Sequence, residues 1–197
     1  MIKLNQLVVV ILLLSVSLMS CDNKKELALQ HSEKESITTC GGKDSSLLNE
    51  ALYQFEQDIT EAYDPEAKIL NSAYGRYLYV GFTGTAEFDR VATSHSITIY
   101  KKLLARNILL EDGGTSNLNY KHPAVQCVIN NMEDKDLSTT INALVETNTM
   151  NPKLFNSRMR NFGRQAKDQR VTALYVALDA FYQHLAPVAQ VAQESNE

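Results

Sequence analysis

SLLNEALYQFEQDITEAY, residues 46–63, is the stretch of this 197-residue chain that most clearly indicates the fold. Its large apolar residues recur every three or four positions: Leu48, Leu52, Phe55, Ile59 and Tyr63. The polar residues between them fall on the opposite side: Glu50, Gln54, Asp58 and Glu61. A period near 3.6 predicts an amphipathic helix. We therefore expect the apolar side to be buried and the polar side to face solvent.

The same periodicity recurs in three other segments, residues 86–106, 137–148 and 164–186, the last expected to end at Pro187. Proline follows a turn or capping residue at three places and predicts three helix starts. These places are Asp64-Pro65, His122-Pro123 and Asn151-Pro152. The longest connection, residues 107–121, contains the turn signal Asp112-Gly113-Gly114 and fits either a solvated connector or a functional loop.

Two segments fit either a helix or a strand. Residues 77–83 combine the β-prone run YLYV with glycine, and residues 96–100 read SITIY. The long periodic neighbours need packing partners, so we interpret both segments as helical. The predicted fold class is all-α, a single helical bundle of about six or seven helices.

Residues 1–21, MIKLNQLVVVILLLSVSLMSC, have a basic Lys3 and then an apolar run. The run is shorter than the roughly 20 residues that span a bilayer, and it is typical of a signal peptide. It closes with Leu18-Met19-Ser20-Cys21, which resembles the lipobox of bacterial lipoproteins. The resemblance implies cleavage after Ser20, and a diacylglycerol with a further acyl chain such as palmitate on Cys21.

The resemblance divides the chain into three parts: a signal peptide at 1–20, a lipid-anchored flexible tether at 21–39, and a helical domain at 40–197. Residues 22–39 are polar and poor in aromatic residues, so they bury little apolar surface. The implied location is the cell envelope, on the periplasmic face or at the cell surface. Attachment to the membrane would be through the lipid on Cys21.

The chain has three cysteines, and a lipid on Cys21 would leave Cys40 and Cys127 as a pair. An oxidising compartment favours a disulfide between them, with two unpaired thiols as the alternative. Two distant cysteines and no clustered histidines do not fit a metal site. We find no phosphate-binding loop, nucleophile elbow or zinc-protease motif, and expect neither a cofactor nor catalytic residues.

Without residues 1–20 the chain carries 18 basic and 23 acidic residues, a net charge of −5. This acidity argues against binding to nucleic acid. Basic residues nevertheless gather between 153 and 170, whereas residues 50–66 are acidic. The two segments either lie side by side, are solvated, or form a basic site for an anionic partner. The candidate binding residues are Arg158, Arg160, Arg164 and Lys167.

His95 lies on the apolar side of its predicted helix, between Val91 and Ile99. It is either a core residue with its hydrogen bonds satisfied or a proton carrier or ligand. His184 is expected near the end of the last helix, where a cation suits the helix dipole.

The leading functional hypothesis is a non-enzymatic binding or assembly module that docks onto an envelope protein or another anionic envelope component. One alternative is a small-molecule binder with a tyrosine-lined interior, for which the candidates are Tyr74, Tyr77, Tyr175 and Tyr182. The other is an enzyme of unrecognised chemistry near His95.

Overall fold

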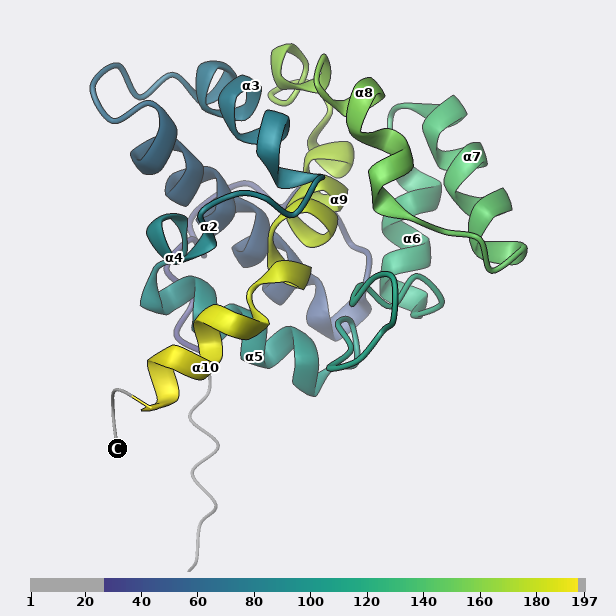
Figure 1. The fold of residues 1–197 in the computed structure, drawn as a ribbon, viewed down its shortest axis with the longest axis horizontal. Helices are drawn as coiled ribbons and strands as arrows, with labels where there is room; N and C mark the ends of the chain where they lie inside the picture. The colour runs from purple at the N-terminus through teal and green to yellow at the C-terminus, as the bar shows by residue number, and fades with distance from the viewer. Residues whose placement is uncertain (1–26, 195–197) are drawn as a thin grey trace, which may run out of the picture.

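A computed structural model of the chain describes residues 27–194 and forms an all-α helical bundle, which confirms the predicted fold class (Figure 1). Within this range, seven helices have nine or more residues: α2 (Ser45–Tyr63), α3 (Leu70–Gly81), α5 (Ser94–Ala105), α6 (Pro123–Asn131), α7 (Lys135–Glu146), α9 (Arg170–Ala180) and α10 (Ala186–Glu194).

Shorter elements join the long helices within residues 27–194. Two are α-helical turns, α4 (Phe88–Val91) and α8 (Asn156–Met159). Four are 3-10 helices, η2 (Gly42–Asp44), η3 (Pro152–Phe155), η4 (Phe162–Arg164) and η5 (Tyr182–His184). The described residues contain no strand, and the extended backbone is limited to an isolated bridge between Leu109 and Leu118.

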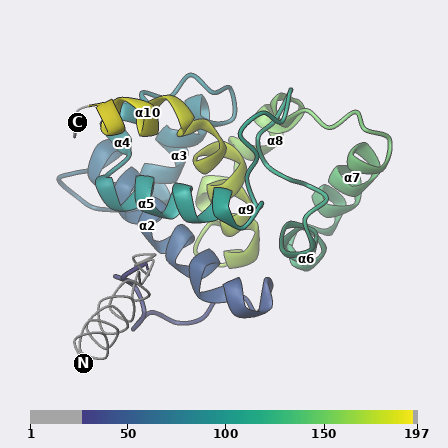
Figure 2. The same cartoon turned by 90° about the horizontal axis from the view of Figure 1, so that it is seen from below.

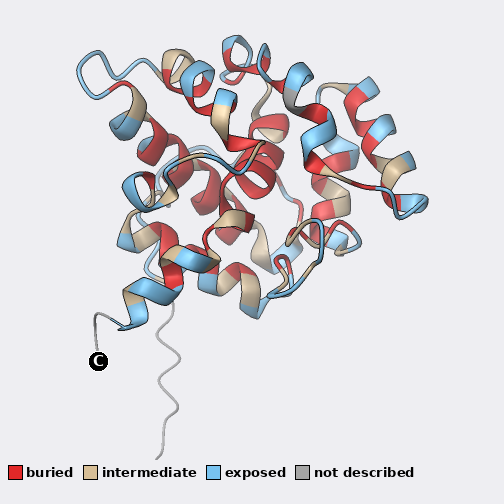
Figure 3. Cartoon of the chain, viewed as in Figure 1, coloured by how far each residue is buried: buried red, intermediate tan, exposed pale blue. Residues whose placement is uncertain are grey.

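Helix α9 lies at the centre of the bundle. Every residue from Thr172 to Ala180 is buried, and α2 and α6 pack against this helix (Figure 3). A helix that is apolar on all sides has no solvent-facing side to expose. The core is therefore organised around a buried α9, with α2 linking it to α3 and α5 (Figure 2).

Two predicted helices are interrupted. The segment 86–106 breaks into α4 and α5, and the Thr93 side chain caps α5 by accepting a hydrogen bond from the Ser96 amide. The segment predicted to run from 164 to 186 is helical only from Arg170 and ends at Ala180. Pro187 does not end that helix but lies in the first turn of α10, where the missing proline N–H is tolerated.

Of the three α-helix starts predicted from proline, one is correct. Pro123 is the first residue of α6, and Nδ1 of His122 accepts a hydrogen bond from the Ala124 amide. Asn151-Pro152 instead begins the 3-10 helix η3. Asp64-Pro65 begins no helix, because the Asp64 carboxylate accepts the Ile69 amide and closes a loop before α3.

The two ambiguous segments are helical, as interpreted. Residues 77–83 begin in α3 and end in the turn after it, and residues 96–100 lie inside α5. Glycine has a specific role where η4 crosses α3, because a Cβ on Gly163 would lie 2.8 Å from the backbone nitrogen of Gly75. The two backbones can approach this closely only because Gly163 has no side chain.

The polar side of α2 corrects the sequence prediction. Glu50, Gln54 and Asp58 are only 2, 2 and 1% exposed, and only Glu61 of the predicted solvent-facing set is exposed. Residues 27–39, which we call the N-terminal segment, cover one part of this side, and the start of α5 covers the rest.

The N-terminal segment lies against α2 without forming a helix or strand. Asn49 Oδ1 accepts the amides of Ile37 and Thr38, and the Tyr53 hydroxyl donates to the Glu35 carbonyl. In this structure the segment belongs with the bundle. Of the predicted tether, residues 21–26 lie outside the described residues, as do the predicted signal peptide and Cys21.

The segment ends at a covalent link to the bundle. The sulfur atoms of Cys40 and Cys127 lie 2.10 Å apart, at disulfide distance, as the cysteine pairing predicted. The bond joins a residue two positions before η2 to the middle of α6, across 87 positions of sequence. Within residues 27–194, no helix combines the length and apolar character needed to cross a membrane.

Candidate functional site

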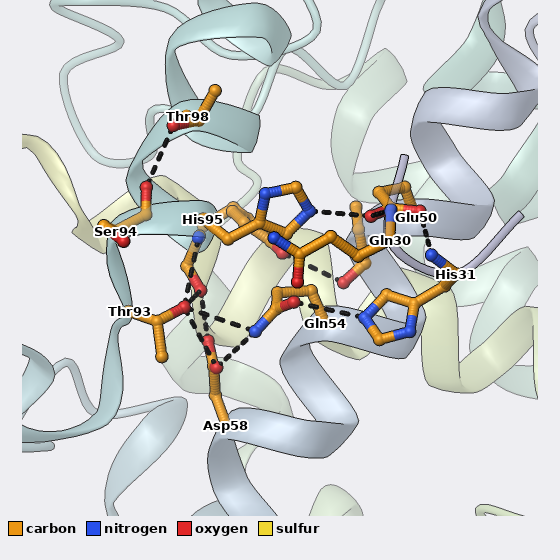
Figure 4. A network of polar contacts seen from close by, with 12 residues as sticks. Gln30, His31, Glu50, Gln54, Asp58, Thr93, Ser94, His95 and Thr98 are labelled. Carbon is orange, nitrogen blue, oxygen red and sulfur yellow. Dashed lines mark hydrogen bonds and ion pairs between the residues drawn. The ribbon is translucent and has the colours of Figure 1, made fainter. Parts of the chain in front are cut away.

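The first candidate site is a buried polar network beneath the N-terminal segment, centred on Glu50 (Figure 4). The Glu50 carboxylate accepts the main-chain amides of Gln30 at 2.6 Å and His31 at 3.0 Å. His95 Nε2, from α5, lies 2.7 Å from the same carboxylate. The N-terminal segment and α5 therefore meet on one buried acid, and three hydrogen bonds compensate for its burial.

Asp58 forms the other end of this network, two helical turns further along α2. It accepts hydrogen bonds from Gln54 Nε2 at 2.7 Å, from the Thr93 hydroxyl at 3.3 Å and from the Ser96 hydroxyl. Burial raises the pKa of Asp58 from 3.8 to about 6, although these hydrogen bonds act to lower it. Asp58 therefore fixes the start of α5 against α2.

Gln54 connects the two ends of the network. Its amide nitrogen donates to Asp58, and its Oε1 lies 3.1 Å from Nε2 of His31, which therefore donates to it. His31 thus contacts α2 through both its main chain and its ring. The network forms a continuous chain of hydrogen bonds from the N-terminal segment to α5.

His95 is the predicted candidate that this network includes. Its side chain is only 11% exposed, and its partner Glu50 is more buried still. The imidazole is therefore largely shielded from solvent and bonds to a carboxylate. A hydrogen-bonded imidazole and carboxylate could also exchange a proton, so the contact leaves the enzyme hypothesis open.

A second buried acid, Asp179 on α9, has a different set of partners. Its carboxylate accepts the hydroxyls of Tyr120 at 2.6 Å and Tyr175 at 2.7 Å, and the Gln183 amide at 2.7 Å. Burial raises the pKa of Asp179 from 3.8 to about 6, against the lowering effect of these bonds. Gln183 Oε1 in turn accepts the Asn117 amide at 3.0 Å. The 107–121 loop is therefore fastened to the core.

The basic and acidic segments meet at one ion pair. The Arg170 guanidinium binds the Glu56 carboxylate through two nitrogens, at 2.5 and 2.9 Å, and the Tyr74 hydroxyl donates to the same carboxylate. Most of the acidic residues between 50 and 66 point into the bundle. The acidic segment therefore forms no continuous acidic surface.

The predicted basic residues separate into two groups. Arg158 donates to both carboxylate oxygens of Asp134, so its charge is already paired. Arg160, Arg164 and Lys167 are exposed, and no described carboxylate forms an ion pair with them. We call these three residues, together with Tyr79, the basic surface.

Tyr79 belongs to this surface because its ring contacts Arg160. The Arg160 guanidinium carbon lies 4.7 Å from the ring centroid, and Tyr79 is 62% exposed. The Asn71 amide on α3 reaches the Arg164 carbonyl at 3.5 Å, which holds η4 across α3.

The four candidate tyrosines are core residues with hydrogen-bonded hydroxyls. Tyr77 donates to the Ala180 carbonyl and Tyr182 to the Ala51 carbonyl, while Tyr74 and Tyr175 donate to buried carboxylates. Their rings pack into the fully buried interior and line none of the described cavities.

The expectation for His184 is wrong. Burial lowers the pKa of His184 from 6.5 to about 4, so the imidazole is neutral at pH 7 and cannot serve as the expected cation. Its ring stacks on Phe88, with centroids 5.1 Å apart. Within residues 27–194, no three His, Cys, Asp or Glu side chains are grouped so that they could hold a metal ion.

Sequence reasoning missed Glu50 and Tyr79. The polar side of α2 is typical of a solvent-facing side, and only the polar composition of the N-terminal segment hinted that it could cover other polar groups. Tyr79 lies in the β-prone run YLYV, and its distance in sequence from Arg160 conceals their contact. No family model, no curated protein and no solved structure matches the chain.

Proposed function

We propose that this protein is a lipid-anchored component of the bacterial cell envelope that binds an acidic protein partner through its basic surface. The observation that carries the binding proposal is that Arg160, which lies over the Tyr79 ring, and the neighbouring cations Arg164 and Lys167 are exposed. None of the three has a carboxylate partner within the described chain.

The lipid anchor rests on the resemblance of residues 1–21 to a lipobox. A lipid on Cys21 accounts for the odd number of cysteines, and a Cys40–Cys127 disulfide suits an oxidising envelope. Two or more acyl chains on one residue would hold the protein firmly on a membrane.

The side chains of the basic surface are of the kinds that concentrate binding energy. Arginine and tyrosine are enriched among the residues that dominate protein interfaces. A guanidinium that lies over an aromatic ring keeps its N–H donors free, because they point outward in the plane of the guanidinium. Two of them can then bind one carboxylate. Arg160 on Tyr79 has this arrangement, and Arg164 and Lys167 would add charge for steering an acidic partner.

The test is a pull-down of the full-length protein from mildly solubilised envelopes, with bound proteins identified by mass spectrometry. The test variant is Arg160→Ser/Arg164→Ser/Lys167→Ser. The matched control, Lys43→Ser/Lys101→Ser/Lys135→Ser, removes the same charge from exposed positions on other elements. We expect the test variant to retain about tenfold less of an acidic partner, and the control to retain wild-type amounts.

Equal retention by the two variants, or no stoichiometric partner, would contradict the binding proposal. Charge-dependent binding of the purified protein to anionic vesicles would instead assign the surface to lipid headgroups. The anchor is tested separately with Cys21→Ser. In this variant the mass added by the lipid should be absent from the mass spectrum, and the protein should be released from membranes. A wild-type protein without lipid would contradict the anchor.

Small-molecule binding is a second candidate because a cavity of about 820 Å³ lies between α5 and α10. Tyr100, Leu104, Leu109 and Ala189 contribute to its wall. A rise in the melting temperature of the purified protein with an envelope extract, lost in Ala189→Trp, would support this candidate. No rise would exclude the extract as a source of the ligand.

A further inference from the structure

The N-terminal segment covers a side of α2 that is built like a solvent-facing surface. Beneath the segment lie Asn49, Glu50, Tyr53 and Gln54, all with polar groups. A permanent cover over a helix normally buries apolar side chains, because apolar burial provides most of the stabilisation. Here only Leu27 and Ile37 of the segment pack partly against the core.

The segment is held mainly by side chains of α2. Its amides at Gln30 and His31 donate to Glu50, and those at Ile37 and Thr38 donate to Asn49. Residues 32–36 are all exposed. If the segment detached, the polar groups of α2 could form hydrogen bonds with water. Exposing this side of α2 therefore costs less free energy than exposing an apolar side would.

We propose that the N-terminal segment is a detachable strap that opens without unfolding of the bundle, with Glu50 as its principal clasp. The Cys40–Cys127 disulfide fixes the end of the strap, so opening stops at residue 40. The Glu50 carboxylate also bonds to His95 of α5. The position of α5 and the opening of the strap are therefore linked through this one carboxylate.

Opening would change how far the bundle reaches from its anchor, a consequence that rests on the proposed lipid on Cys21. Residues 21–26 can span at most about 20 Å, because an extended chain covers about 3.4 Å per residue. With the strap open, residues 21–39 could span about 65 Å. The strap would then set two distances between the membrane and the basic surface.

Limited trypsin digestion of the purified full-length protein tests the strap. Lys34 lies in its exposed middle, and Arg76 lies in α3 and reports opening of the bundle. Cleavage needs a locally unfolded stretch, so its rate follows the population of the open form. In the wild type we expect cleavage after Lys34 to be at least about tenfold faster than after Arg76.

Glu50→Gln should raise the cleavage rate after Lys34 by about tenfold, because a neutral amide replaces the charged acceptor of two main-chain amides. The matched control is Glu61→Gln, the same change on an exposed part of α2, and it should leave this rate unchanged. Cleavage after Arg76 should stay slow in both variants.

Two results would overturn the proposal: equal cleavage rates after Lys34 and Arg76 in the wild type, or equal cleavage after Lys34 in the two variants. If Glu50→Gln is cleaved throughout the bundle, Asn49→Ala replaces it, because Asn49 holds only Ile37, Thr38 and Ser36. A wild-type rate after Lys34 in Asn49→Ala would then overturn the proposal. The digestion requires neither lipid nor partner, so its failure leaves the proposed function standing.

Discussion

The Glu50 and Asp179 networks use similar chemistry for different structural purposes. Each centres on a buried carboxylate that accepts three or more hydrogen bonds. All partners of Asp179 come from α9, η5 and the fastened 107–121 loop. Two of the three partners of Glu50 come from a segment without regular structure and with an exposed middle.

The comparison shows that a buried carboxylate need not belong to a contact that stays closed in the native state. Asp179 accepts hydrogen bonds from two buried tyrosines, so its loss would leave polar groups without their acceptor in the interior. Glu50 holds a segment that can move away, after which water can replace the lost bonds. The predictions below compare these two regions.

The largest effect is expected where the N-terminal segment is covalently fixed. Cys40→Ser/Cys127→Ser removes the constraint on a loop of 87 residues, and the chain-entropy model gives a loss of about 4.6 kcal/mol in the free energy of unfolding. Urea denaturation measures it. Unchanged stability would mean that the disulfide does not constrain the unfolded chain.

The second-largest effect is expected from replacing the two buried acids, Asp179 and Glu50, by alanine. Asp179→Ala should lower the free energy of unfolding by about 3 kcal/mol, because Tyr120, Tyr175 and Gln183 lose their common acceptor in the interior. Glu50→Ala should cost about 1 to 2 kcal/mol, since the N-terminal segment can open and hydrate. Equal losses in urea denaturation would remove the distinction between the regions.

Lowering the pH should raise the free energy of unfolding through the two buried aspartates, Asp58 and Asp179. The pKa of Asp58 and that of Asp179 are raised to about 6 in the fold, above the unfolded value of 3.8. The folded state therefore binds more protons, and each residue should add about 1 kcal/mol of stability as the pH falls from 7.5 to 5.

His184 acts in the opposite direction. Its pKa in the fold is lowered to about 4, so its contribution is present above pH 6.5 and is lost as the pH falls toward 4. The Asp58 effect is therefore measured as the stability difference between the wild type and Asp58→Asn at each pH. This difference should move by about 1 kcal/mol in favour of the wild type from pH 7.5 to 5, and a move in the other direction contradicts the raised pKa.

The smallest effect separates main-chain from side-chain contacts in the N-terminal segment. Gln30→Ala should leave stability within about 0.3 kcal/mol of wild type, because its contact with Glu50 uses the main-chain amide. His31→Ala loses the ring contact with Gln54 and should cost about 0.5 to 1 kcal/mol. A larger loss from Gln30→Ala would show that its side chain contributes to docking.

The sequence predicts the α2 helix and the all-α fold because apolar periodicity is a local property of residues 46–63. It does not predict that Glu50 and Asp58 are buried, because their cover comes from the N-terminal segment and from Thr93 and Ser96. Periodicity also fails in α9, where apolar residues on all sides hide the true end at Ala180.

The candidate site was only partly predictable for the same reason. The cysteine pair and the basic residues can be read from composition and spacing. Which of those cations is already neutralised depends on tertiary contacts, as the pairing of Arg158 with Asp134 illustrates.

Native-state hydrogen exchange of the wild-type protein tests the distinction between the two regions most directly. The amides to compare are those of Gln30 and His31, which donate to Glu50, and that of Asn117, which donates to Gln183. We predict that the Gln30 and His31 amides exchange at least about tenfold faster than the Asn117 amide. Their exchange should occur through local opening of the N-terminal segment, whose rate does not change at low denaturant concentration. Exchange of all three amides at one rate, with the denaturant dependence of global unfolding, would contradict the account.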